Sequence, residues 1–167
     1  METITEFEIN VDKVNQLLHS NRWEQMISEG CTAQKMLDIS DKVLQRYYAA
    51  AEQLLQEQNW IEAKNAFSFL TFLNPCMHHF WVGLGIAEQA QGHFHEAVQA
   101  YIMGTVTNAE DPVVHANAFQ CYSALKQEGH ALESFYKAIE CCSDKPEFAA
   151  IRTKTMQYKR QLDLMPK

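Results

Sequence analysis

The stretch FWVGLGIAEQAQGHFHEAVQAY, residues 80–101, can be interpreted in two ways. Gly83 and Gly85 could belong to a glycine-rich loop that binds phosphate, and His93 and His95 could bind a metal ion. The same residues could instead form two packed helices joined by a turn at Gly92. The first interpretation predicts an enzyme, and the second predicts a protein that holds another chain.

An internal repeat with a period of 34 residues favours the two helices. Shifting the sequence by this period aligns three alanines, and an aromatic residue follows each alanine four positions later. The aligned alanines are Ala63, Ala97 and Ala131. The aligned aromatic residues are Phe67, Tyr101 and Phe135. This pattern is typical of helical hairpins, which cannot bury both faces alone and therefore stack on one another.

The spacing resembles that of the tetratricopeptide repeat, whose W-x-x-L-G…A-x-x-x-F pattern has the same period. The middle unit matches best, at Trp81, Leu84, Gly85, Ala97 and Tyr101, although it has Glu88 at a position that is usually aromatic. We therefore expect an all-α fold, a right-handed superhelix of three tetratricopeptide-like helical hairpins. An N-terminal helical extension and a C-terminal capping helix complete it. Gly83 and Gly85 then mark helix crossings.

The predicted organisation has three parts. Residues 1–39 form the N-terminal helical extension, and residues 146–167 form the capping helix. Residues 40–145 hold the three repeats, at about 44–77, 78–111 and 112–145. The predicted helices cover residues 10–20, 23–38, 41–57, 60–73, 76–91, 94–107, 112–126, 128–142 and 146–163. Ser40 with Asp41, Asp111 with Pro112, and Pro146 are expected to start helices.

Composition and charge limit the classes of function. The 167 residues are 47% hydrophobic and 21% charged, which is typical of a globular protein, and the net charge of −7 argues against binding nucleic acid. Residues 147–167 hold five basic and two acidic side chains, a charge of +3, so residues 1–146 carry −10. This asymmetry predicts neutral or basic partners for the acidic body, although solvated helix faces would give the same charges.

Targeting signals and cysteines predict a cytoplasmic protein. The N-terminus, METITEFEINVDK, lacks the basic and apolar regions of a secretory signal. The longest apolar run, residues 80–87, is too short to cross a bilayer, so we expect no direct membrane insertion. The five cysteines show no disulfide-framework spacing, which fits a reducing compartment.

No motif supports a catalytic, cofactor or metal site. A dinucleotide loop needs a preceding strand and a glycine where Glu88 stands, whereas residues 80–91 have helical spacing. Two groups contain histidines, Cys76 with His78 and His79, and His93 with His95, but neither has a zinc-ligand spacing. A Cys–His catalytic pair stays open on sequence alone, although scattered cysteines on amphipathic helices are more often core residues.

A concave repeat surface binds peptides, and its expected lining follows from the repeat. The first helix of each unit directs side chains into the groove one, five and eight residues after Tyr47, Trp81 and His115. The expected lining is Tyr48, Glu52, Leu55, Val82, Ile86, Gln89, Ala116, Gln120 and Ser123. Alternatively, some of these residues pack between helices. A clamp for an acidic C-terminus is not expected, because Glu52 stands where that clamp needs asparagine and would repel the ligand.

Three segments resemble the class II chaperones of bacterial type III secretion. They are VLQRYYAAAEQLLQEQNWIEAKNAF at 43–67, FWVGLGIAEQAQGHFHEAVQAYIMG at 80–104 and DKPEF at 144–148. Within them, F-W-V-G-L-G, G-H-F-H-E-A and K-P-E-F are the most telling runs. The resemblance extends from residue 43 to residue 147, and residues 1–39 match only in being helical.

The resemblance implies a function. Such chaperones hold two hydrophobic translocator proteins soluble and apart in the bacterial cytoplasm, and release them at the secretion machine. An extended translocator segment of the P-x-L-x-x-P type lies in the concave groove, where Tyr48, Leu55, Val82 and Ile86 would supply apolar pockets. Glu52 stands where relatives can carry an aromatic residue. Family members often form homodimers, partly through the N-terminal helix, which implies a possible dimerisation role for residues 1–39. The alternative is a generic tetratricopeptide-repeat scaffold for other cytosolic proteins.

Overall fold

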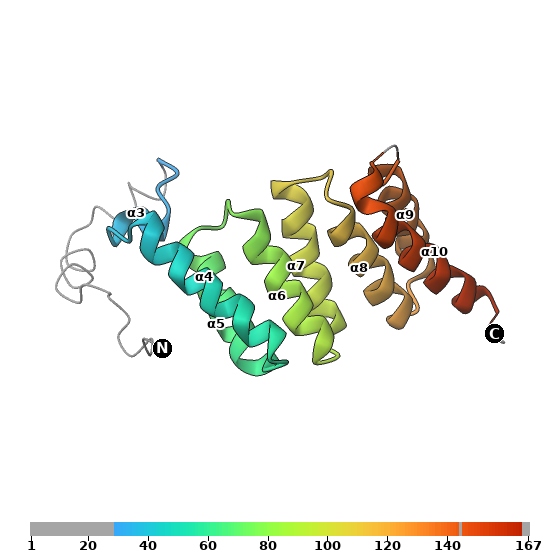
Figure 1. The fold of residues 1–167 in the computed structure, drawn as a ribbon, viewed down its shortest axis with the longest axis horizontal. Helices are drawn as coiled ribbons and strands as arrows, with labels where there is room; N and C mark the ends of the chain where they lie inside the picture. The colour runs from blue at the N-terminus through green and yellow to red at the C-terminus, as the bar shows by residue number, and fades with distance from the viewer. Residues whose placement is uncertain (1–28, 144, 165–167) are drawn as a thin grey trace.

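The fold is a row of helix pairs. The computed structural model describes residues 29–143 and 145–164, which form eight α-helices and one 3-10 helix and contain no strand. After α3 (Ala33–Met36), the pairs are α4 (Asp41–Gln56) with α5 (Trp60–Leu73), α6 (His78–Ala90) with α7 (Phe94–Thr107), and α8 (Pro112–Ala124) with α9 (Glu128–Cys141). The pairs follow one another along the long axis of the molecule (Figure 1). The predicted all-α fold of stacked hairpins is confirmed.

The helix starts and the turns follow the repeat. The Ser40 hydroxyl accepts a hydrogen bond from the Val43 amide, and the Asp111 carboxylate accepts one from the Val113 amide, so both predicted caps form. The turn inside each pair has one residue in the left-handed region. These turn residues are Gln58, Gly92 and Lys126, with φ of 59°, 79° and 57°, and they are one repeat period apart. Each left-handed residue ends the first helix of its pair.

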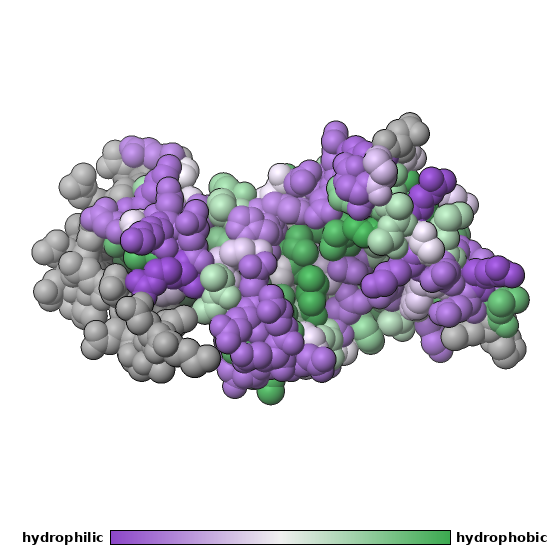
Figure 2. Space-filling view, in the orientation of Figure 1, coloured by the Kyte–Doolittle hydropathy of each residue, from purple (hydrophilic) through white to green (hydrophobic). Residues whose placement is uncertain are grey.

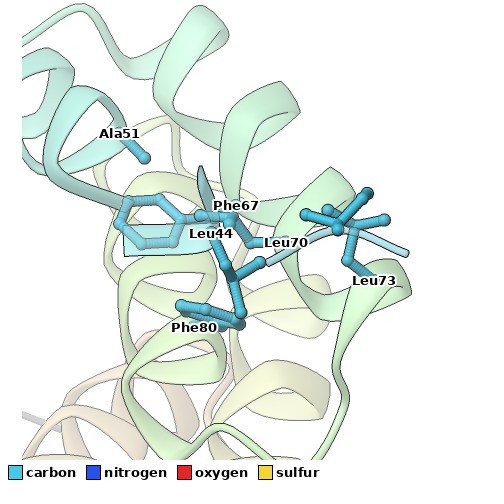
Figure 3. Close-up of a cluster of buried hydrophobic side chains, with 7 residues drawn as sticks. Leu44, Ala51, Phe67, Leu70, Leu73 and Phe80 are labelled. Carbon is cyan, nitrogen blue, oxygen red and sulfur yellow. The ribbon is translucent and has the colours of Figure 1, made fainter. Parts of the chain in front are cut away.

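The first core cluster joins α4, α5 and the start of α6. Leu44 and Ala51 of α4, Phe67, Leu70 and Leu73 of α5, and Phe80 of α6 are all buried, and Figure 3 shows their side chains converging between the helices. A second cluster joins α7 to α8 in the same manner, with Tyr101 and Val114 fully buried. Each pair therefore shares its core with the next, as stacked repeats require.

Two glycines allow the helices to cross closely. A Cβ added to Gly83 would overlap the ring of Phe67 on α5, and one added to Gly85 would overlap the ring of Tyr101 on α7. The repeat alanines Ala63 and Ala97 have no exposed surface. The predicted helix crossings are therefore confirmed, and each glycine accommodates one of the aligned aromatic rings.

The prediction of one helix over residues 23–38 is wrong in its described part. Gly30 lies in a turn with φ of 74°, and α3 covers only four residues after its cap, Thr32. Asp38, with φ of 54°, then separates α3 from α4. Local backbone geometry, which the apolar pattern does not report, divides the segment. The predicted helix at 10–20 lies outside the described residues.

The C-terminal helix closes the row of pairs (Figure 1). It begins as a single 3-10 turn, η1 (Pro146–Phe148), and continues as α10 (Ala149–Asp163), so the α-helix starts three residues later than predicted. α10 packs on α8 and α9, with Thr155 buried and the Tyr158 ring 5.4 Å from the ring of Phe119. No helix within the described residues is both long and apolar enough to span a membrane.

Candidate peptide-binding groove

The predicted groove residues lie on α4, α6 and α8, the first helices of the three pairs. Glu52 is exposed and Ala116 is buried, so Ala116 packs between helices, as the alternative interpretation predicts. The others are half-buried: Tyr48, Leu55, Val82, Ile86, Gln89, Gln120 and Ser123. Part of each half-buried side chain packs on the core, and the part that stays exposed could be covered by a ligand.

Tyr48 lines a cavity between α4 and the start of α6. The cavity has a volume of about 280 Å³, and its lining combines apolar and polar side chains: Asp41, Leu44, Gln45, Tyr48, Asn74, Met77, His79 and Phe80. The centroid of the Tyr48 ring lies 5.7 Å from that of Phe80 and 6.1 Å from that of Phe67. An apolar interior with polar groups at its edge suits one apolar side chain of a peptide.

Glu52 is hydrogen-bonded to Tyr48, which lines the cavity. The Tyr48 hydroxyl donates to Oε1 of Glu52 at 2.5 Å, one helical turn away on α4. Burial and then this hydrogen bond raise the pKa of Tyr48, so the phenol stays protonated. Glu52 therefore orients the Tyr48 ring at the edge of the cavity.

His79 belongs to the same surface. Its ring lies 4.5 Å from that of Tyr48 and 4.6 Å from that of Phe80, both in edge-to-face geometry. Burial, followed by the neighbouring His78, lowers the pKa of His79, so its imidazole is neutral at pH 7. In the sequence, His79 stands out only as a potential metal ligand. Extending the row Val82, Ile86 by one helical turn towards the N-terminus would have found it.

A buried glutamine holds the rim of this cavity. Gln34 of α3 is 5% exposed, and its Nε2 donates to Asp41 Oδ1 at 2.8 Å and to the Ile39 carbonyl at 3.2 Å. Its Oε1 accepts from Nδ2 of Asn74 at 2.8 Å. Asp41 and Asn74 both line the cavity, so α3 fixes the N-terminal end of the candidate groove.

Replacing Gln34 by alanine is expected to lower the free energy of unfolding by about 1–3 kcal/mol, because it removes three hydrogen bonds made by a buried side chain. Urea denaturation checks this. Gln53→Ala is the matched control, since Gln53 is exposed and its side chain donates to Glu57 on its own helix. The effect of this substitution should stay within about 0.5 kcal/mol. Equal losses for the two variants would show that the network does not stabilise the protein.

At the other end of the predicted groove, a hydrogen bond between two glutamine side chains joins α6 to α8. Gln89 Nε2 donates to Gln120 Oε1 at 3.1 Å, while Gln89 Oε1 accepts from the hydroxyl of buried Tyr101 at 2.8 Å. Burial raises the pKa of Tyr101, which keeps this donor protonated. The row of predicted residues is therefore apolar and hollow near Tyr48 and polar near Gln89.

Two of the four candidate metal-ligating histidines, His78 and His93, link neighbouring structural elements. His78 Nε2 lies 2.7 Å from Asp111 Oδ2 and its Nδ1 lies 3.0 Å from the Gly104 carbonyl, which connects the starts of α6 and α8 with the end of α7. His93 Nδ1 lies 2.8 Å from Oε2 of Glu88, a buried side chain at the position that is usually aromatic. Across the described ranges, no three His, Cys, Asp or Glu side chains gather around a potential metal.

Three thiols are held in their protonated form. Burial raises the pKa of Cys121 to about 12, and it also raises the pKa values of Cys141 and Cys142. A catalytic cysteine needs the opposite shift, because the thiolate is the nucleophile. These cysteines therefore act as packing residues.

Fold and candidate groove together define a tetratricopeptide-like protein-binding module with its candidate peptide groove on the first helices of the pairs. No protein-family model matches the sequence. The chain is 27% identical over 131 residues to the low calcium response locus protein H of Yersinia pseudotuberculosis, a match that covers 78% of each chain.

Solved structures extend this similarity. A type III secretion complex from Aeromonas hydrophila has the same fold, with a TM-score of 0.80, 24% identity, and coverage of 86% of this chain and 96% of that one. The Yersinia enterocolitica type III secretion chaperone SycD, in complex with a peptide of the translocator YopD, is 26% identical with a TM-score of 0.71, covering 75% of this chain and 96% of SycD. The resemblance to type III secretion translocator chaperones is thus confirmed.

Proposed function

We propose that this protein is a type III secretion chaperone that binds hydrophobic translocator proteins in the bacterial cytoplasm and keeps them soluble and secretion-competent. The observation that carries this proposal is its similarity to SycD, which is solved with a translocator peptide, over nearly all of SycD. The cavity beside Tyr48, with the half-buried apolar residues Leu55, Val82 and Ile86 on α4 and α6, supports the proposal, because apolar side chains of a client could cover this surface.

The physical basis of such a function is the masking of apolar surface. A protein destined for a membrane exposes apolar segments that aggregate in water. A groove that covers one extended segment lowers this exposure without chemistry or a nucleotide. We propose that Tyr48, Leu55, Val82 and Ile86 contact apolar side chains of a P-x-L-x-x-P segment, each anchor contributing about 1.5–3 kcal/mol. The prolines reduce the entropy that the segment loses on binding.

No catalytic role is part of this proposal, because the similar proteins are chaperones and the thiols of Cys121, Cys141 and Cys142 are protonated. The second candidate is a generic scaffold for other cytosolic proteins, which the same helical hairpins could serve. The two differ in the client: a chaperone must change the solubility of an apolar protein, whereas a scaffold only needs to bind soluble ones. A homodimer is compatible with both.

Co-expression tests this difference. The tagged chain should co-purify with a translocator encoded in the same genome, and the translocator should move from the insoluble to the soluble fraction and resist protease. A soluble secreted protein of similar size is the control and should neither bind nor change. If the translocator stays insoluble while soluble proteins bind, the scaffold function is correct and the chaperone function is not.

A further inference from the structure

The C-terminal helix occupies the place of the first helix in a fourth repeat. Shifting the sequence by one more period of 34 residues aligns Pro146 with Pro112, which begins α8, and aligns Thr155 with Cys121. Both Thr155 and Cys121 are buried against the preceding pair. α10 therefore packs against the preceding pair, α8 and α9, as α8 packs against α6 and α7. Within the described residues, no helix lies against α10 as α9 lies against α8.

The face of α8 that meets α9 corresponds to an open face on α10. Tyr122 of α8 stacks on His130 of α9 with ring centroids 5.2 Å apart. The counterpart of Tyr122 on α10 is Met156, which is 49% exposed, and Arg152, one helical turn before Met156, is also exposed. A cavity of about 560 Å³ lies along this face, lined by Cys142, Lys145, Pro146, Ala149, Arg152, Thr153 and Met156.

The open face is basic, in contrast to the acidic body of the chain. Arg152 and Arg160 lie two helical turns apart on α10 with Met156 between them, and Lys145 joins Arg152 at the cavity. Neither arginine forms an ion pair with a carboxylate of the described residues, and Lys145 Nζ is 3.7 Å from Glu110 Oε2. Figure 2 shows the end that carries α10 as mostly hydrophilic.

We propose that this face of α10 is a docking site for one acidic amphipathic helix of a partner protein other than the translocator. A helix is the expected element because the site is the vacant place of a second hairpin helix. Carboxylates one or two turns apart would meet Arg152 and Arg160, and the arginine fork favours such paired contacts. An apolar side chain between them would cover Met156 and enter the cavity.

The site does not overlap the cavity beside Tyr48. The cavity beside Tyr48 lies at the α4 end of the stack, and α10 lies at the opposite end (Figure 1). A chaperone with a translocator segment in its groove can therefore bind the acidic helix at the same time. In this way another protein could recognise the loaded chaperone.

The probe is a labelled, alanine-based helical peptide of fifteen residues with glutamates at three positions four residues apart and a leucine beside the middle one. Its control peptide has glutamine in place of glutamate. Binding to the full-length protein is measured by fluorescence anisotropy, with and without a bound translocator segment. Arg152→Glu is compared with Lys154→Glu, which makes the same charge change on the same helix but outside the cavity.

The wild type and Lys154→Glu should bind the acidic peptide, and Arg152→Glu should bind it about tenfold more weakly or worse. Binding should fall with added salt, exceed that of the glutamine peptide, and persist when the groove is occupied. Equal binding by the two variants, or competition with the translocator segment, would overturn the proposal. So would anionic vesicles or a second copy of the chain binding in its place with the same dependence on Arg152.

Discussion

Glutamate in place of Ile86 is expected to remove the translocator from the purified complex while the helix content remains that of the wild type. Ile86 is half-buried on α6, one helical turn after Val82, so part of its side chain is available to a ligand. Covering an apolar anchor of this size contributes about 1.5–3 kcal/mol, and a charge at its place should weaken binding about tenfold or more. Co-purification and circular dichroism measure the two effects.

Ile61→Glu is the matched control for this prediction. Ile61 is 61% exposed at the start of α5, a second helix of its pair, so the same substitution there should leave both binding and folding unchanged. Full client affinity in Ile86→Glu, with its fold intact, would mean that Ile86 does not line the groove. The same result in a Tyr48 and Leu55 double variant would contradict the groove itself.

Alanine in place of Gly83 or Gly85 is expected to lower the free energy of unfolding by about 1–3 kcal/mol. The added Cβ would overlap the ring of Phe67 or Tyr101, and both rings are fully packed in the core. Overpacking of this kind forces helices apart, and the loss outweighs the gain in helix propensity, which is at most about 1 kcal/mol. Urea denaturation of each variant measures the change.

Gly129 provides the control with the opposite sign. It also lies in a helix, α9, but a Cβ there would meet no atom within 4 Å. Gly129→Ala should therefore stabilise the protein by up to about 1 kcal/mol through helix propensity alone. If Gly83→Ala and Gly85→Ala also stabilise, the close crossings do not hold the repeats together.

The repeat architecture could be predicted because it depends on the spacing of residues that are close together in the sequence. An alanine and an aromatic residue four positions later recur with one period, and the buried Ala63 and Phe67 show that the spacing reports the packing. The division around Gly30 and Asp38 could not be predicted in the same way. It depends on two left-handed residues and on Gln34, whose partner Asn74 is 40 residues away.

The candidate site could be predicted only in part, because helix register does not reveal which side chains enclose a hollow. Tyr48 lines the cavity as a groove residue should, whereas Ala116, on the same predicted row, is buried between helices. His79 was not predicted as a groove residue, because the sequence does not show that its ring contacts Tyr48 on α4 as well as Phe80 beside it on α6. The binding role of the row stays a prediction.

Site-specific photo-cross-linking tests the central claim most directly. A photoreactive residue at Glu52, which is exposed beside Tyr48 on α4, is compared with one at Val106, which is 72% exposed on α7. With the translocator bound, position 52 should cross-link to the P-x-L-x-x-P segment, and position 106 should not. Cross-links to that segment from position 106 and none from position 52 would contradict a client-binding groove on the first helices of the repeats.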